Sequence, residues 1–178
     1  GDALALQLMS TFLLRGLGFS LTDVGVAYKT IGFAASIMGA LAGGALLGRL
    51  GLFRGLLLFG MAQAFSNLLF MLLALVGKNY TMMITSMFLE NFFTGMSTTA
   101  LVVFVTALCH QKYSATQFAC LSALFSIGRI FLGPLAAFMV QSMGWANFYA
   151  WTFVVCFPGL ILLALMRTRI TFNAEAIA

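Results

Sequence analysis

Long apolar runs with a few polar residues inside them constrain this chain more than any other feature. The run from Ser114 to Gln141 carries Arg129 near its middle, and it is long enough to cross a bilayer, since a spanning helix needs about 20 apolar residues. A charge at that depth costs about 3 kcal/mol on insertion scales, so it must face protein or a water-filled cavity. Another apolar run carries a carboxylate, Glu90, at matching depth. The two residues predict a helical bundle built around a buried polar pair.

The composition excludes a soluble domain. Of the 178 residues, 62% are hydrophobic and 7% are charged, whereas about 25% are charged in a typical soluble domain. We therefore expect an all-α integral membrane protein, and we assign the net charge of +5 to loops beside the membrane rather than to nucleic-acid binding. The cysteines and the single histidine have neither metal-ligand nor disulfide spacing. No metal, no cofactor and no nucleic-acid partner is expected.

Breaks between the apolar runs predict six transmembrane helices within residues 1–169, followed by a polar cytoplasmic tail over residues 170–178. The first helix is short for a span, so we expect it to be truncated at its N-terminal end. No basic region precedes it, and no signal peptide is expected. The predicted spans run from the start to about Leu17, Thr22 to Gly48, Arg54 to Val76, Tyr80 to Leu108, Ala115 to Gln141 and Asn147 to Met166.

Basic residues in the loops predict the orientation, because cytoplasmic loops carry an excess of Lys and Arg. With alternating connections, one side collects Arg49, Arg54, Lys112, Arg167 and Arg169, and the other side has Arg15 and Lys78. The first side is therefore expected in the cytoplasm. Trp145, Tyr149 and Trp151 are then expected at the outer membrane interface, where amphipathic aromatic residues collect.

Polar residues mark one face on several predicted spans. Gln63, Ser66 and Asn67 mark the third span, Glu90, Asn91, Thr94 and Ser97 the fourth, and Ser122, Ser126, Arg129 and Gly133 the fifth. Such faces must turn toward one another or toward water. Glu90 and Arg129 are either an ion pair that locks the bundle or residues that line a pathway for solute or protons. The amides and hydroxyls beside them favour a large polar ligand. The sequence carries no metal cluster, phosphate loop or nucleophile–base pair, so we do not expect an enzyme.

The second predicted span carries small residues on one face. Gly32, Ser36, Gly39 and Gly43 recur at three- and four-residue steps, as does Lys29. Small residues let helices approach closely in a membrane, so this face is predicted to pack against another helix. Packing alone does not explain a lysine on the same face.

The sequence after this span resembles the cytoplasmic loop signature of the major facilitator superfamily. Gly44, Arg49, Gly51 and Arg54 fit the pattern of glycines and basic residues, and Gly48 stands where the signature has an acidic residue. The resemblance implies a transporter built from two six-helix halves.

Further stretches look like the C-terminal six-helix half of the AmpG-type anhydromuropeptide permeases. They are G-D-A at Gly1 to Ala3, K-T-I-G at Lys29 to Gly32, E-N-F-F-T-G-M at Glu90 to Met96, S-A-T-Q-F-A at Ser114 to Ala119 and G-R-I-F-L-G-P at Gly128 to Pro134. The resemblance implies proton-coupled import of GlcNAc-anhydroMurNAc peptides across the bacterial inner membrane, for peptidoglycan recycling. Membrane lipid and an N-terminal six-helix half would be the partners.

The candidate site residues follow from these two lines of argument. Arg129, Asn91, Asn67, Gln63 and Lys29 are expected to bind substrate, and Glu90 and Asp2 to carry the coupling proton. Two alternatives stay open. One is a permease of the same fold for another solute, such as acetyl-CoA, a sugar or a peptide, and the other is a structural membrane fragment that transports nothing.

Overall fold

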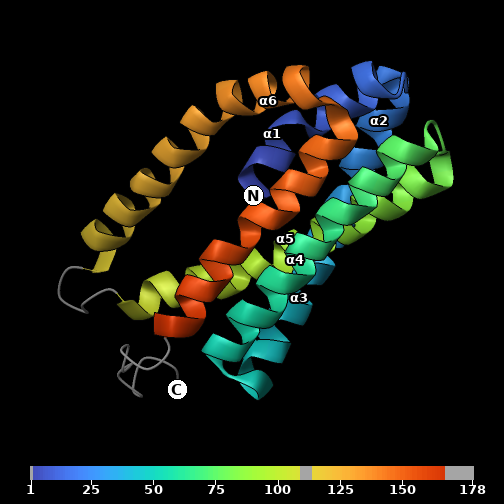
Figure 1. Cartoon of the computed structure of the whole chain (residues 1–178). Coiled ribbons are helices and arrows are strands. Elements are labelled where there is room, and N and C mark those ends of the chain that lie inside the picture. Colours follow the sequence, from blue (N-terminus) through green and yellow to red (C-terminus); the bar gives the residue numbers. More distant parts are fainter. Residues whose placement is uncertain (1, 109–113, 167–178) are drawn as a thin grey trace.

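The computed structural model describes residues 2–108 and 114–166, and every regular element within those ranges is a helix (Figure 1). Two of the elements are short π-helical turns, labelled η, which continue the α-helices beside them. The elements are α1 (Asp2–Thr11), η1 (Phe12–Gly16), α2 (Leu21–Ala27), η2 (Tyr28–Gly32), α3 (Phe33–Leu50), α4 (Leu52–Val76), α5 (Tyr80–Leu108) and α6 (Ser114–Met166).

Glycines in the left-handed region of φ form the tight reversals between helices. Gly51 (φ 77°) alone separates α3 from α4, and Gly77 (φ 85°) ends α4. Gly144 (φ 78°, ψ 169°) divides α6 into a first arm, residues 114–143, and a second arm, residues 145–166. In Figure 1 the amber first arm rises from the lower left and the orange-to-red second arm descends toward the C-terminal end. A side chain at these positions would be strained, because residues with a Cβ rarely adopt such a backbone conformation.

Four stretches are long and apolar enough to cross a membrane within the described ranges: Leu21–Leu50, Leu52–Val76, Tyr80–Ala107 and Leu132–Leu165. They confirm an all-helical, multi-pass membrane protein. They do not confirm the predicted number of six spans, because α1 and η1 have only ten and five residues and the last stretch runs through the Gly144 hinge. The predicted tail, residues 170–178, lies outside the described residues.

The interior is organised around α5, which packs against α3 on one side and α4 on the other, while α4 and α1 both pack against α6. The largest buried apolar cluster joins α1, η1, α2, α4, α5 and both arms of α6. Tyr149 is at its centre, with its ring 5.0 Å from that of Phe12 and 5.5 Å from that of Phe70. The expected position of Tyr149 at the outer membrane interface stays a prediction, but the sequence did not predict that this side chain packs inside the bundle. Its side chain is fully buried, because the Gly144 hinge turns this part of the second arm toward α1 and α4.

The predicted small-residue face of the second span packs directly against α5. A Cβ at Gly39 would strike the backbone carbonyl of Phe92, and one at Gly43 would lie 2.8 Å from the Cα of Met96. From the other helix, a Cβ at Gly95 would meet the backbone of Ser36. The close approach of α3 and α5 thus requires glycines on both helices, as the sequence pattern predicted for α3.

Candidate solute-binding and coupling sites

A π-helical turn, η2, interrupts the second span at Lys29, eight residues after the helix begins at Leu21. At about 1.5 Å per residue this places Lys29 about 12 Å along the helix. That depth is inside a hydrocarbon core of about 30 Å. π-Turns are rare and often coincide with functional sites. Here the turn sets the register of Lys29 relative to α3.

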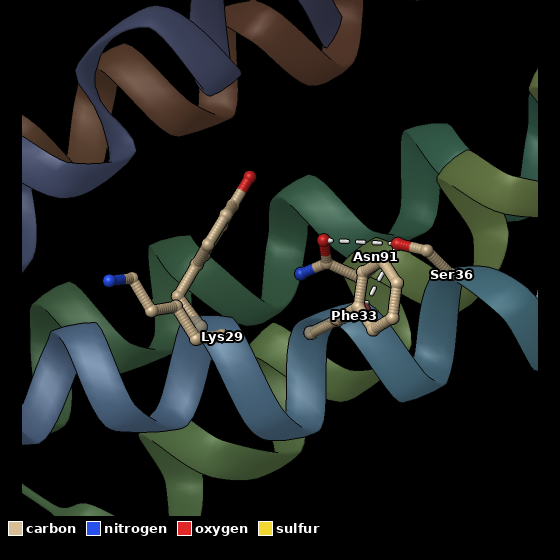
Figure 2. Close-up of a pocket in the computed structure, with 6 residues that line it drawn as sticks. Lys29, Phe33, Ser36 and Asn91 are labelled. Carbon is tan, nitrogen blue, oxygen red and sulfur yellow. Dashed lines mark hydrogen bonds between the residues drawn. The ribbon is translucent and has the colours of Figure 1, made fainter.

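A cavity of about 270 Å³ lies beside this turn (Figure 2). Its wall comes from three adjoining elements and is lined by Tyr28, Lys29, Gly32, Phe33, Ser36 and Asn91. Figure 2 shows the side chains of Asn91 and Ser36 next to each other, with the Lys29 side chain extending away from the ribbon. The cavity therefore brings together two predicted binding residues, Lys29 and Asn91.

Asn91 is positioned by contacts from both helices. Its Nδ2 donates to the Met87 carbonyl at 2.7 Å, while its Oδ1 lies 3.5 Å from the Ser36 hydroxyl. Ser36 donates at the shorter distance of 3.0 Å to the Gly32 carbonyl. A Cβ at Gly32 would lie 3.2 Å from Asn91 Nδ2, so this glycine leaves room for the amide. The amide keeps hydrogen-bonding capacity for a ligand, because each amide group has two donors and an acceptor.

Lys29 supplies the positive charge of this site. Its side chain is exposed, and among the described residues no ion pair to its ammonium group is found. An exposed ammonium group at this depth cannot face lipid without a cost of about 3 kcal/mol. The side of the second span that carries Lys29 must therefore face water or additional protein, and an anionic group that enters the cavity gains a cationic partner.

Glu90 lies in the interior instead, on the side of α5 that faces α4. It is 1% exposed, and its Oε1 accepts a hydrogen bond of 2.8 Å from Gln63 Nε2. The same Gln63 nitrogen donates to Thr94 Oγ1 at 3.1 Å, while Ser66 Oγ contacts Glu90 Oε2. The predicted meeting of the polar faces of the third and fourth spans is confirmed.

The hydrogen bonds of Ser66 suit a protonated Glu90. The Ser66 hydroxyl also lies 2.6 Å from the Gln63 carbonyl, and a hydroxyl has one hydrogen to donate. When that hydrogen goes to the carbonyl, the contact between Ser66 and Glu90 Oε2 needs a hydrogen from the carboxyl group. The pair can therefore hold a proton on Glu90 without losing a hydrogen bond.

Asn67 is fully buried one turn beyond Gln63, and its Nδ2 lies 3.9 Å from Cys156 Sγ. Three buried polar atoms in this region have no hydrogen-bond partner among the described residues: Asn67 Oδ1, Ser86 Oγ and the Tyr149 hydroxyl. Buried polar groups in native proteins are nearly always satisfied, often by internal water. The sequence pattern located Gln63 and Asn67 but gave no sign that Tyr149 and Cys156 join them.

Several predicted site residues cannot be placed. The side chains of Arg129 and Asp2 lie outside the described part of the chain, so the expected pair of Glu90 and Arg129 stays a prediction. Arg49, in the last turn of α3, and Arg54, in the first turn of α4, are exposed on either side of Gly51. No group of three His, Cys, Asp or Glu side chains that could hold a metal occurs in the described ranges.

The family model for the Major Facilitator Superfamily matches residues 1–176. The chain belongs to the major facilitator superfamily. This membership accounts for the glycine and arginine signature around Gly51, and for a bundle of apolar helices whose polar faces turn inward.

Curated relatives include the anhydromuropeptide permease of Escherichia coli (strain K12), which is 46% identical over 173 residues. That match covers 97% of this chain and 35% of the permease. The putative transporter AmpG 4 of Rickettsia conorii is 32% identical, over 96% of this chain and 41% of its own length. The putative transporter AmpG 1 of the same organism is 30% identical, over 95% of this chain and 40% of its own length. The chain thus spans about a third to two fifths of the length of these relatives, which are named as a permease and transporters.

Proposed function

We propose that this chain is the C-terminal half of a proton-coupled importer of anhydromuropeptides, GlcNAc-anhydroMurNAc peptides, in the bacterial inner membrane. Its role would be peptidoglycan recycling. Similarity to the Escherichia coli permease over 97% of the chain supports the substrate class. Coverage of 35% of that permease supports a second, N-terminal half as partner.

The observation that carries the proposal is the exposed Lys29 beside Asn91 in the cavity next to η2. Anhydromuropeptides carry carboxylates on the peptide stem and amide and hydroxyl groups on the sugars. Lys29 binds a carboxylate of the solute, and Asn91 hydrogen-bonds a neighbouring amide or hydroxyl. Arg129 contributes a second cation to the same pathway, and the N-terminal half closes the cavity.

Glu90 carries the coupling proton in this mechanism, with Asp2 as the second candidate. A buried carboxyl that is hydrogen-bonded by Gln63 and Ser66 can exist in the protonated form. Gln63 and Asn67 are buried, at 5% and 0% exposure, and Gln63 donates a hydrogen bond to Glu90. Their direct contact with solute requires the rearrangement between inward- and outward-open states.

The test is uptake by the full-length transporter in proteoliposomes with an imposed pH gradient. Labelled GlcNAc-anhydroMurNAc tripeptide is the solute, and unlabelled acetyl-CoA, disaccharide and free tripeptide are competitors. We expect accumulation that a protonophore abolishes and that only the anhydromuropeptide competes away. Competition by acetyl-CoA, the disaccharide or the free tripeptide instead would assign the carrier to another solute, and the absence of any uptake would leave a structural role.

A further inference from the structure

A second cavity, of about 310 Å³, lies on a different side of α5 from the cavity beside η2. It is an open groove bordered by α4, α5 and the second arm of α6, and it is lined by Gly60, Gln63, Ser97, Val155, Cys156, Gly159 and Leu160. None of its lining residues belongs to the cavity beside η2. The two cavities therefore approach α5 from different sides.

Among the described residues, only the Gln63 side chain is identified between this second cavity and the Glu90 carboxyl group. Gln63 is part of the cavity wall, and its Nε2 donates to Glu90 Oε1 at 2.8 Å. Gln63 itself is 5% exposed, so its amide separates the cavity from the buried carboxyl. A small movement of this amide would give water contact with Glu90.

The cavity extends from the level of Glu90 toward the end of the bundle that carries Arg49 and Arg54. Gly60 lies three residues nearer than Gln63 to the Gly51 turn, and Ser97 lies seven residues beyond Glu90 toward the same end. Gly159 follows Cys156 in the same direction along the second arm. The cavity thus runs from the carboxyl toward the basic end of the bundle.

Three polar side chains, those of Gln63, Ser97 and Cys156, lie along this path among glycine and apolar residues. Ser97 donates to the Phe59 carbonyl at 3.2 Å, and Cys156 donates through Sγ to the Thr152 carbonyl at 3.2 Å. Gly60 and Gly159 bring no side chain into the space. Internal water occupies cavities that are roomy and offer it two or more polar partners.

We propose that the second cavity is a water-filled route by which Glu90 exchanges its proton with the aqueous phase at the basic end of the bundle. Solute enters beside Lys29 and the proton enters beside Gln63, on different sides of α5. Proton exchange at Glu90 then needs no opening of the solute cavity. The inference rests on the proposed proton coupling at Glu90.

The first test uses the native thiol of Cys156 in the full-length transporter. With the other cysteines replaced by serine, including Cys109→Ser and Cys120→Ser, a small water-soluble methanethiosulfonate reagent should modify Cys156. The rate should stay unchanged when saturating GlcNAc-anhydroMurNAc tripeptide is present. An unreactive Cys156, or one that the tripeptide protects, would overturn the separate route.

The second test fills the cavity. A Cβ at Gly159 meets nothing within 4 Å, so Gly159→Leu places a side chain in the space without a backbone clash. We expect this variant to lose tenfold or more of its pH-driven uptake and to keep solute exchange without a gradient. Ala164→Leu, at an exposed alanine on the same arm, is the matched control and should retain both. Equal loss of uptake and exchange, or loss of neither, would contradict the route.

The outcomes separate this inference from the proposed function. Failure of the wild-type transporter to respond to a pH gradient removes the coupling role of Glu90, whatever the thiol reaction shows. A normal gradient response with a selective defect in Gly159→Leu supports both. A normal gradient response with an unreactive Cys156 removes only the second cavity as the route.

Discussion

Glu90 and Asn91 are consecutive residues, yet their side chains contact different helices on different sides of α5. The Glu90 carboxyl accepts a hydrogen bond from Gln63 on α4, while the Asn91 amide meets Ser36 on α3. Successive residues of an α-helix point about 100° apart, since there are 3.6 residues per turn. In the proposed mechanism, a movement of α5 alone can therefore connect the solute site with the proton site. This coupling through α5 is the basis of the first two predictions.

Replacement of Lys29 should weaken solute binding specifically. A hydrogen bond to a charged group contributes about 1.5–3 kcal/mol, so Lys29→Gln should raise the apparent KM for anhydromuropeptide by about 10- to 100-fold. Uptake kinetics of the full-length transporter in proteoliposomes measure this. Lys78→Gln is the matched control, because Lys78 donates to the Gly18 carbonyl in a loop contact. A muropeptide with amidated stem carboxylates should bind the wild type and Lys29→Gln equally well, and a persistent difference would count against a carboxylate partner.

Glu90→Gln should separate exchange from accumulation. A glutamine at this position can accept from Gln63 and donate to Ser66, which reproduces the contacts of a protonated glutamate. We expect the variant to fold and to exchange solute across the membrane, and to lose accumulation against a gradient. Uptake with and without a pH gradient measures the two activities.

A conservative partner variant gives the control for this prediction. Thr94→Val removes a hydroxyl that accepts from Gln63 at 3.1 Å without changing charge, and it should leave pH-driven accumulation within about threefold of normal. Normal pH-dependent accumulation by a well-expressed Glu90→Gln protein would remove Glu90 from the coupling mechanism.

The class of protein, the polar faces and the packing face of the second span could be predicted from the sequence. Each of them follows from the helical period and from the cost of polar groups in lipid. It could not predict the π-turn at Lys29, which is a one-residue change of hydrogen bonding with no residue signature. Nor could it predict the burial of Tyr149, which depends on the direction in which Gly144 turns the second arm. The sequence also did not predict that Glu90 lies apart from the cavity beside Lys29. The depth of a residue along a span does not determine which neighbouring helix its side chain contacts.

The contact between α3 and α5 predicts a strong dependence on position among the glycines of α3. Gly39→Ala should destabilise the transporter by about 1–3 kcal/mol, the usual cost of overpacking, because its Cβ would meet the Phe92 backbone. Gly44→Ala should have no such cost, since a Cβ there meets nothing within 4 Å. Thermal unfolding of the purified full-length protein in detergent gives the comparison. Equal melting temperatures for the two variants would mean that α3 and α5 are further apart than described.

The Gly51 turn gives a matched pair of alanine variants only three residues apart. Gly51 has φ 77° and ψ 157°, a region that is occupied almost only by glycine, and residues forced into it cost about 1–3 kcal/mol. Gly48 is helical, and a Cβ there meets nothing within 4 Å. Gly48→Ala should therefore raise stability by up to about 1 kcal/mol through helix propensity.

Neither position has a neighbour for the new methyl group, so packing contributes nothing to the difference and the backbone conformation alone decides the sign. We expect Gly51→Ala to lower the melting temperature of the full-length transporter and Gly48→Ala to leave it equal or higher. The reverse order would show that the chain between α3 and α4 does not turn at Gly51.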